Sequence, residues 1–127
     1  MTQAISPRSK GFKRLFVFEK ARELATETIR LTDQFPKSEI LSSVQQMRRA
    51  AFSIISNIAE GYRRGSRKEY INFLRVAYGS CGELSAQLII AHDVNWIGQQ
   101  DFQRMQVLAD DVSGLLWRLI QSLSSSK

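Results

Sequence analysis

The sequence predicts an all-α protein, an antiparallel up-down bundle of four helices in a single domain of 127 residues. Apolar residues recur at spacings of three and four in four separate stretches, which is the period of an amphipathic helix. The chain contains only two prolines, and no segment alternates with the period of a strand. Short connections between the stretches favour antiparallel neighbours. We expect the bundle to occupy residues 12–123, with a flexible basic leader at 1–11 and a disordered tail at 124–127.

The first helix is expected at about residues 13–34 and the second at about 38–60. Pro36 separates them, because the residue before a proline is disfavoured in helical geometry. Gly61 follows the second apolar stretch, and a glycine in the left-handed conformation commonly ends a helix. We therefore expect the second helix to stop at Gly61.

The third helix is expected at about residues 66–94 and the fourth at about 99–123. Ser66 and Glu69 have the spacing of a capping box. In that motif the serine hydroxyl accepts a hydrogen bond from an amide of the first turn and the glutamate reaches back. Ser66 is therefore the expected start of the third helix.

The residue inventory argues against catalysis and against a resident metal or other cofactor. With one cysteine, Cys81, and one histidine, His92, the chain cannot form an internal disulfide or a four-ligand zinc site. These two residues are eleven positions apart on one expected helix, about 16 Å along its axis, which is too far for a catalytic dyad. An enzyme that uses Glu60 or Glu83 as acid or base is the weaker alternative, since neither has an expected partner at catalytic spacing.

The composition is that of an ordinary globular domain, with 43% hydrophobic and 24% charged residues. No apolar run approaches the roughly 20 residues that span a bilayer, and the N-terminus lacks the apolar segment of a secretory signal. A single cysteine fits a reducing compartment. We expect a cytoplasmic protein that does not bind membranes.

Positive charge is concentrated in the first part of the chain. The net charge is +6, with 15 Lys and Arg against seven Asp and Glu in residues 1–75, and three against five in residues 76–127. Arginine, which outnumbers lysine twelve to six, suits contacts with phosphate and carboxylate groups. This asymmetry favours a nucleic-acid or acidic-protein partner over none, although a solvated basic loop is the simpler alternative. The candidate phosphate contacts are Arg48, Arg49, Arg63, Arg64, Arg67 and Lys68.

Some apolar and small residues remain after one stripe of each helix is assigned to the core. On the third helix they lie opposite the core stripe, and on the fourth helix a tryptophan points away from the centre of its stripe. Exposed apolar surface of this kind marks an interface, so we expect a homo-oligomer. A broad intramolecular core is the alternative. The candidate interface residues are Gly79, Gly82, Ala86, Ile90 and Trp117.

Several segments together resemble one protein family. They are LFVFEKA at 15–21, QMRRAA at 46–51, SIISNIAEG at 53–61 and SRKE at 66–69. The chain resembles the bacterial four-helix-bundle proteins encoded by intervening sequences within 23S rRNA genes. Besides the two arginines of the second segment and Lys68, the residues that match the family signature are Asn57, Glu60, Gly61, Ser66 and Glu69.

The resemblance implies more about fold than about activity. It implies a left-handed up-down bundle and a ring-like homo-oligomer, with a homopentamer favoured. The related accessory variability determinant of diversity-generating retroelements forms a basic pentameric barrel that binds nucleic acid and its reverse transcriptase. Two positions depart from the family pattern: Phe18 stands where tryptophan is common, and Ile55 where proline is common. Without that proline the second helix should be straighter.

The combined prediction is a non-enzymatic oligomer that binds RNA or DNA non-specifically through an arginine-rich surface. Binding would be electrostatic, so affinity should fall steeply with salt. The alternative is an adaptor that docks an acidic partner, such as a polymerase or reverse transcriptase, and has no nucleic-acid role of its own.

Overall fold

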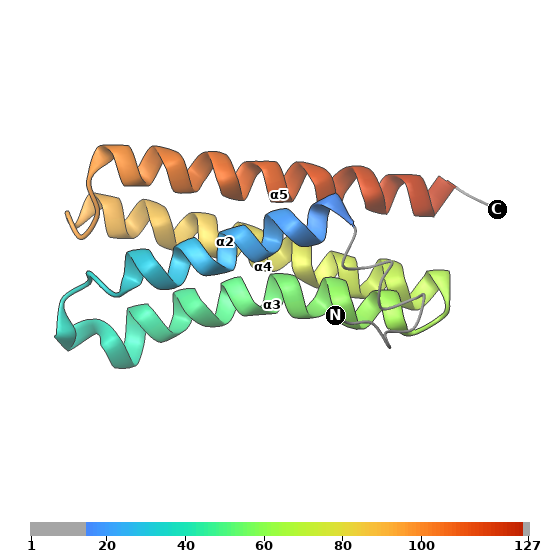
Figure 1. Cartoon of the computed structure of the whole chain (residues 1–127), viewed down its shortest axis with the longest axis horizontal. Coiled ribbons are helices and arrows are strands. Elements are labelled where there is room, and N and C mark those ends of the chain that lie inside the picture. Colours follow the sequence, from blue (N-terminus) through green and yellow to red (C-terminus); the bar gives the residue numbers. More distant parts are fainter. Residues whose placement is uncertain (1–14, 126–127) are drawn as a thin grey trace, which may run out of the picture.

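The computed structural model describes residues 15–125 and places four long helices side by side, with each helix antiparallel to the next in sequence (Figure 1). Among these residues there are helices and no strands. The four helices are α2 (Phe16–Thr32), α3 (Gln45–Arg63), α4 (Arg67–Asp93) and α5 (Gln99–Ser125). The predicted all-helical bundle is thus confirmed. The predicted leader at 1–11 and the start expected at residue 13 lie outside the described residues.

The boundaries of the second and fourth helices differ from the prediction. A 3₁₀ turn, η1 (Lys37–Glu39), and a π-helical turn, η2 (Ile40–Val44), precede α3, which begins seven residues later than expected. The hydroxyls of Ser42 and Ser43 lie 3.3 and 3.0 Å from Glu39 Oε1, and these side-chain bonds accompany the widened turn. At the other end, α5 continues through Ser125, two residues into the expected tail.

The predicted stop at Gly61 is wrong. The second helix continues through this residue to Arg63, and Gly65 adopts the left-handed backbone instead, with φ of 88°. Gly61 is buried inside the helix, and a Cβ atom added there would lie 2.7 Å from Phe73 Cβ and 3.1 Å from Tyr70 Cδ1. The glycine is therefore required for the close approach of α3 and α4, not for a turn.

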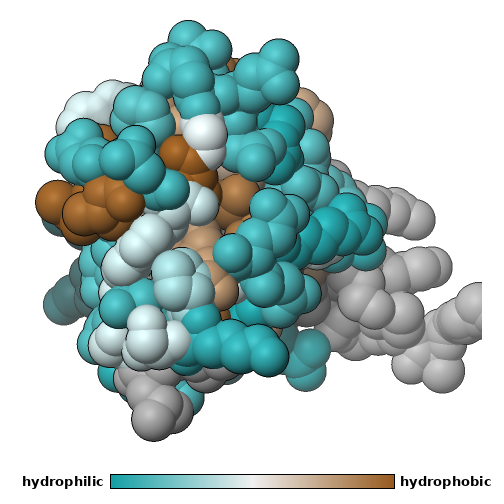
Figure 2. Space-filling model, turned by 90° about the vertical axis from the view of Figure 1, so that its left-hand side faces the viewer, coloured by the Kyte–Doolittle hydropathy of each residue, from teal (hydrophilic) through white to brown (hydrophobic). Residues whose placement is uncertain are grey.

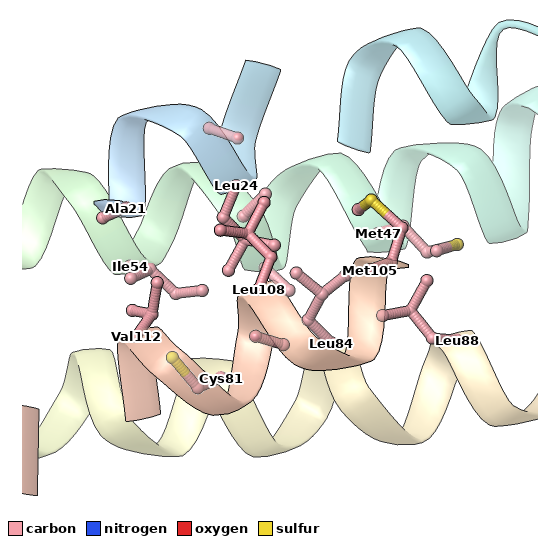
Figure 3. Close-up of a cluster of buried hydrophobic side chains, with 14 of the residues drawn as sticks. Ala21, Leu24, Met47, Ile54, Cys81, Leu84, Leu88, Met105, Leu108 and Val112 are labelled. Atoms are coloured by element: carbon pink, nitrogen blue, oxygen red, sulfur yellow. The ribbon is translucent and has the colours of Figure 1, made fainter. Parts of the chain in front are cut away.

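The core fills the centre of the bundle with side chains from all four helices. The helices contact one another in the cyclic order α2, α3, α4, α5 and back to α2, which gives a square cross-section. Figure 3 shows Leu24, Ile54, Leu84 and Met105 converging from the four helices. Cys81 also faces this core and is fully buried.

Candidate functional site

A group of basic residues surrounds the connection between α3 and α4. We call it the basic turn and define it by its five side chains: Arg63, Arg64, Arg67, Lys68 and Arg75. Ser66 begins α4 as predicted, because its Oγ atom accepts a hydrogen bond of 3.1 Å from the amide of Glu69. Gly65 has a positive φ of 88° and Ser66 an extended backbone, with φ −118° and ψ 143°, and over these residues the chain turns from α3 into α4.

Within this group, the Arg64 side chain forms contacts with both α3 and α4. Its Nε atom lies 2.9 Å from Glu60 Oε2, its Nη1 atom lies 3.7 Å from Glu69 Oε2, and its guanidinium lies 4.9 Å from the ring centroid of Phe73. Two carboxylates therefore offset its charge. Glu60 and Glu69, two residues of the predicted family signature, serve here to hold the helix connection.

Arg67, Lys68 and Arg75 line one surface hollow of about 470 Å³. Within residues 15–125 the other lining residues are Ile71, Asn72, Leu123 and Ser124, and none of these is acidic. All three basic residues are exposed, and Lys68 and Arg75 form no ion pair with another described residue. The hollow lies where the first turns of α4 meet the C-terminal end of α5, so the two helix dipoles oppose each other there and the basic side chains supply the attraction for an anion. This arrangement can accommodate phosphate or carboxylate groups.

Arg75 was missing from the residues selected by sequence. It lies seven positions after Lys68, which is two helical turns, so both project from the same side of α4. This seven-residue spacing is the sequence feature that could have identified Arg75 as part of the group. It was overlooked because Arg75 sits inside an apolar stretch, away from the run of charges at 63–68.

The structure separates the two remaining predicted arginines from the basic turn. Arg48 Nη2 lies 2.7 Å from Asp33 Oδ1 and donates to the Ile29 carbonyl at 3.3 Å, while its Nε atom donates to Thr32 Oγ1 at 2.9 Å. Arg48 thus ties the C-terminal end of α2 to α3. Arg49 is exposed, about 21 Å along α3 from Arg63.

A polar contact between α3 and α4 explains another signature residue. Ser80 Oγ donates to Ser53 Oγ at 2.8 Å, and Asn57 Nδ2 donates to the Ser53 carbonyl at 2.7 Å and to its hydroxyl at 3.1 Å. The Asn57 side chain therefore supports a serine that joins the two helices.

The five predicted interface residues all lie at the surface. A Cβ atom added to Gly79 or Gly82 would meet no heavy atom within 4 Å, and Ala86 is exposed. Ile90 is 58% and Trp117 51% exposed. Figure 2 views the end of the bundle that carries the α2–α3 and α4–α5 connections. Hydrophobic side chains gather at the left of this view, and hydrophilic ones cover most of the rest. The five residues that the sequence analysis could not assign to the core are therefore exposed in the single chain.

Of the residues considered for catalysis, Cys81 and His92 are packed against the fold and Glu60 is in an ion pair. Burial raises the pKa of the Cys81 thiol to about 12, against a smaller lowering by a hydrogen bond with Ser113. The His92 ring stacks on Phe102 with centroids 4.2 Å apart, and Glu83 is exposed. Across residues 15–125, no three His, Cys, Asp or Glu side chains are grouped so as to hold a metal ion. In the same part of the chain, no helix has the length and apolar character needed to cross a bilayer.

The geometry defines a class of protein, a square four-helix bundle with an apolar core. Residues 13–118 match the family described as the 23S rRNA-intervening sequence protein, and the chain belongs to that family. No curated protein matches the sequence.

A solved structure has the same fold. It is a crystal structure from Bacteroides thetaiotaomicron VPI-5482, described as a protein with unknown function from the S23 ribosomal protein family. The two structures superpose with a TM-score of 0.77 at 23% sequence identity, over 83% of this chain and 95% of that one. At this level of identity, the likeness shows a shared fold alone.

Proposed function

We propose that this protein is a non-enzymatic, cytoplasmic, oligomeric nucleic-acid-binding protein that contacts phosphates through Arg67, Lys68 and Arg75 of the basic turn. The observation that supports this most directly is that Arg67, Lys68 and Arg75 line one hollow whose other described lining residues are not acidic. Three predicted contacts are left out of this phosphate-binding set. Arg64 and Arg48 are paired with carboxylates within the fold, and Arg49 lies about 21 Å along α3 from Arg63.

Binding to the nucleic acid is electrostatic and does not depend on the nucleotide sequence. Each phosphate that a basic side chain neutralises releases condensed counterions, so the logarithm of the affinity falls with the logarithm of the salt concentration. Three contacts per copy give a slope of roughly −2 to −3 on single strands or duplex DNA. Base readout is not part of the proposal, because phosphate contacts position a nucleic acid without specifying its sequence.

Oligomerisation multiplies these contacts. One hollow with three basic residues is a weak site, whereas several copies in one assembly engage the same strand at high effective concentration. The exposed apolar surface on α4 and α5 supports assembly, and the family resemblance favours a ring of five. We include the homopentamer in the proposal on that ground.

The test is a salt titration of binding to labelled structured RNA and duplex DNA, with the mass of the same sample measured by light scattering. Replacing Arg67, Lys68 and Arg75 by Gln should weaken binding at least tenfold in low salt and flatten the salt slope. A matched control replaces Lys37, Arg49 and Arg118, three exposed residues outside the basic turn, and removes the same charge. Equal losses in both triple variants would show that net charge, not the hollow, is responsible.

The second candidate is an adaptor that docks an acidic protein, such as a polymerase or reverse transcriptase. The same hollow favours it, because arginine binds carboxylates as well as phosphates. The two proposals separate in one experiment. Absence of binding to nucleic acid in low salt, with retained binding to an acidic partner, would support the adaptor.

A further inference from the structure

Three side chains of α4 lie in a row along one side of the hollow at the basic turn. Lys68, Asn72 and Arg75 are separated by four and three residues, so they project from the same face of the helix. Lys68 and Arg75 are about 10 Å apart along the axis, with Asn72 between them. All three are exposed and line the hollow. A group bound over Asn72 therefore has a long, flexible cationic side chain on either side.

The other side of the hollow belongs to the C-terminal end of α5. Leu123 and Ser124 line it there, and Arg67 in the first turn of α4 adds a third cation. Figure 1 shows that the start of α4 and the end of α5 lie at the same end of the bundle. Ile71 and Leu123 are partly buried and give the hollow an apolar part. The hollow thus combines three cations, two short polar side chains and an apolar surface.

The charge of this cluster distinguishes between two kinds of phosphate. An internal phosphodiester of a nucleic acid carries one negative charge on two unesterified oxygens. A terminal phosphate monoester carries a charge of about −1.5 to −2 near neutral pH and presents three strong acceptor oxygens. Arg67 and Arg75 offer planar forks of N–H donors, and Lys68 offers an ammonium group. Three cations in one hollow therefore match a monoester better than a single diester.

The apolar part of the hollow suits the nucleoside that carries the phosphate. The base and sugar of a nucleoside have apolar faces, which pack against aliphatic side chains such as Ile71 and Leu123. The hollow measures about 470 Å³, within the range of sites that hold one small ligand. The Asn72 amide and the Ser124 hydroxyl add hydrogen-bonding groups without charge. This combination suits one nucleotide with its terminal phosphate.

We propose that the hollow binds the terminal phosphate monoester of a nucleic-acid strand. The phosphate lies over Asn72, between Lys68 and Arg75. The terminal nucleoside packs against Ile71 and Leu123. The inference rests on the proposed nucleic-acid binding and specifies its ligand as the end of a strand. A free mononucleotide has the same chemistry, but only a strand adds neighbouring phosphates that reach the rest of the basic turn.

The first measurement compares labelled oligonucleotides that end in a phosphate or in a hydroxyl. The reference is a 5′-hydroxyl strand two nucleotides longer than the 5′-phosphate strand, so that both carry the same charge at pH 7.5. The 5′-phosphate strand should bind about tenfold more tightly than this reference. A 3′-phosphate strand tests the other end. Tighter binding of either phosphorylated end supports the inference, and the comparison assigns the end.

The outcomes separate this inference from the proposed function. Equal binding of the phosphate and hydroxyl strands would overturn the inference and leave electrostatic binding of nucleic acid intact. No binding of any strand or duplex in low salt would overturn both. A free nucleoside monophosphate that binds as tightly as the phosphorylated strand would contradict the assignment to a strand end.

Single substitutions test whether the hollow is responsible for the preference. The measured quantity is the ratio of the two dissociation constants, in which a general loss of charge cancels. Arg75→Gln should lower the ratio from about tenfold to less than threefold, and Asn72→Leu, which keeps the charge, should lower it about threefold. Arg49→Gln removes the same charge from an exposed residue of α3 and should keep the ratio. The same ratio in all three variants would rule out the hollow as its source.

The pH dependence gives an independent test, because the second pKa of a phosphate monoester is about 6 and a phosphodiester does not titrate in this range. Lysine and arginine keep their charge there. The single histidine, His92, is 24 residues beyond Lys68 on α4, about 36 Å along the axis, and Glu60 and Glu69 are paired with Arg64. The ratio should therefore fall to less than threefold at pH 5.5. A ratio that stays near tenfold at this pH would contradict binding of the monoester.

Discussion

Gly61 of α3 lies so close to Phe73 of α4 that an added Cβ atom would be 2.7 Å from the Cβ atom of Phe73. The phenylalanine Cβ is fixed to its backbone and cannot move aside as the tip of a long side chain can. Tyr70 narrows the same space, with its Cδ1 atom at 3.1 Å and its carbonyl oxygen at 3.3 Å from that position. Gly61 thus sets the spacing of the two helices that carry the basic turn.

Gly61→Ala should destabilise the fold despite the better helix propensity of alanine. We expect a loss of about 1–3 kcal/mol in the free energy of unfolding, the range for an overpacked site. Denaturant titration followed by circular dichroism would measure it. Gly114→Ala is the control, because its Cβ would meet only the flexible end of Arg118 at 3.5 Å, and it should gain up to about 1 kcal/mol. A stabilised Gly61→Ala variant would contradict the close packing.

Arg48 should matter for stability and Arg49 should not. Arg48→Gln loses the ion pair with Asp33 and the guanidinium that contacts the C-terminal end of α2, so we expect a loss of about 1–2 kcal/mol. The exposed Arg49→Gln variant, with the same change of charge, should stay within about 0.5 kcal/mol of the native protein. Equal stabilities of the two variants would show that the Arg48 contacts contribute nothing.

The cap of α4 gives a prediction of its own. Ser66→Ala removes the acceptor of the Glu69 amide and should cost about 1 kcal/mol, whereas Ser66→Asp, which can still accept this bond, should restore most of it. Thermal unfolding of the three proteins would decide. Ser56→Ala, an exposed serine in the middle of α3, should be neutral or slightly stabilising.

Stability should fall in alkali because of Cys81. Burial raises the pKa of its thiol from 9.0 to about 12, and burial together with Tyr62 raises the pKa of Tyr70 from 10.0 to about 12. Both groups are neutral when protonated, so their contribution is complete below pH 9 and is lost as the pH rises toward 12, because the unfolded chain releases these protons first.

The experiment compares the free energy of unfolding of the native protein and Cys81→Ala from pH 8 to pH 11. Between pH 9 and 10 the native protein should lose up to about 1.4 kcal/mol per pH unit more than the variant. Tyr70→Phe isolates the second group above pH 10. Parallel curves for the native protein and Cys81→Ala would show that the thiol is not shielded from solvent.

The sequence alone predicted the number, order and approximate extent of the helices, because apolar periodicity reports directly which face each helix buries. It also predicted Ser66 as a cap, since a capping box is a local interaction read within four residues. Gly61 was misassigned because a glycine at the end of an apolar stretch has the same local signature whether it turns the chain or admits a neighbouring helix. Only the position of Phe73 separates the two cases.

The candidate site was predictable only in part, for a similar reason. The run of charges at 63–68 identifies a basic turn, but it cannot show which side chains are neutralised by the fold. Arg64 is paired with Glu60, four residues away, and this partner could have been inferred from helical spacing. The partners of Arg48 lie at the C-terminal end of α2 and in the residue that follows it, 15 or more residues away, and no local rule reveals them.

The cyclic order of the helices also has a consequence for how the bundle forms. Three of its four seams join helices that follow one another in the chain, and the fourth joins α2 to α5. There, Arg104 Nη1 lies 2.6 Å from Glu27 Oε1 across a sequence separation of 77 residues. Closing a long loop is entropically costly, so this seam should form after the others and after the rate-limiting step of folding. Breaking the Glu27–Arg104 pair should therefore accelerate unfolding and leave the rate of folding almost unchanged.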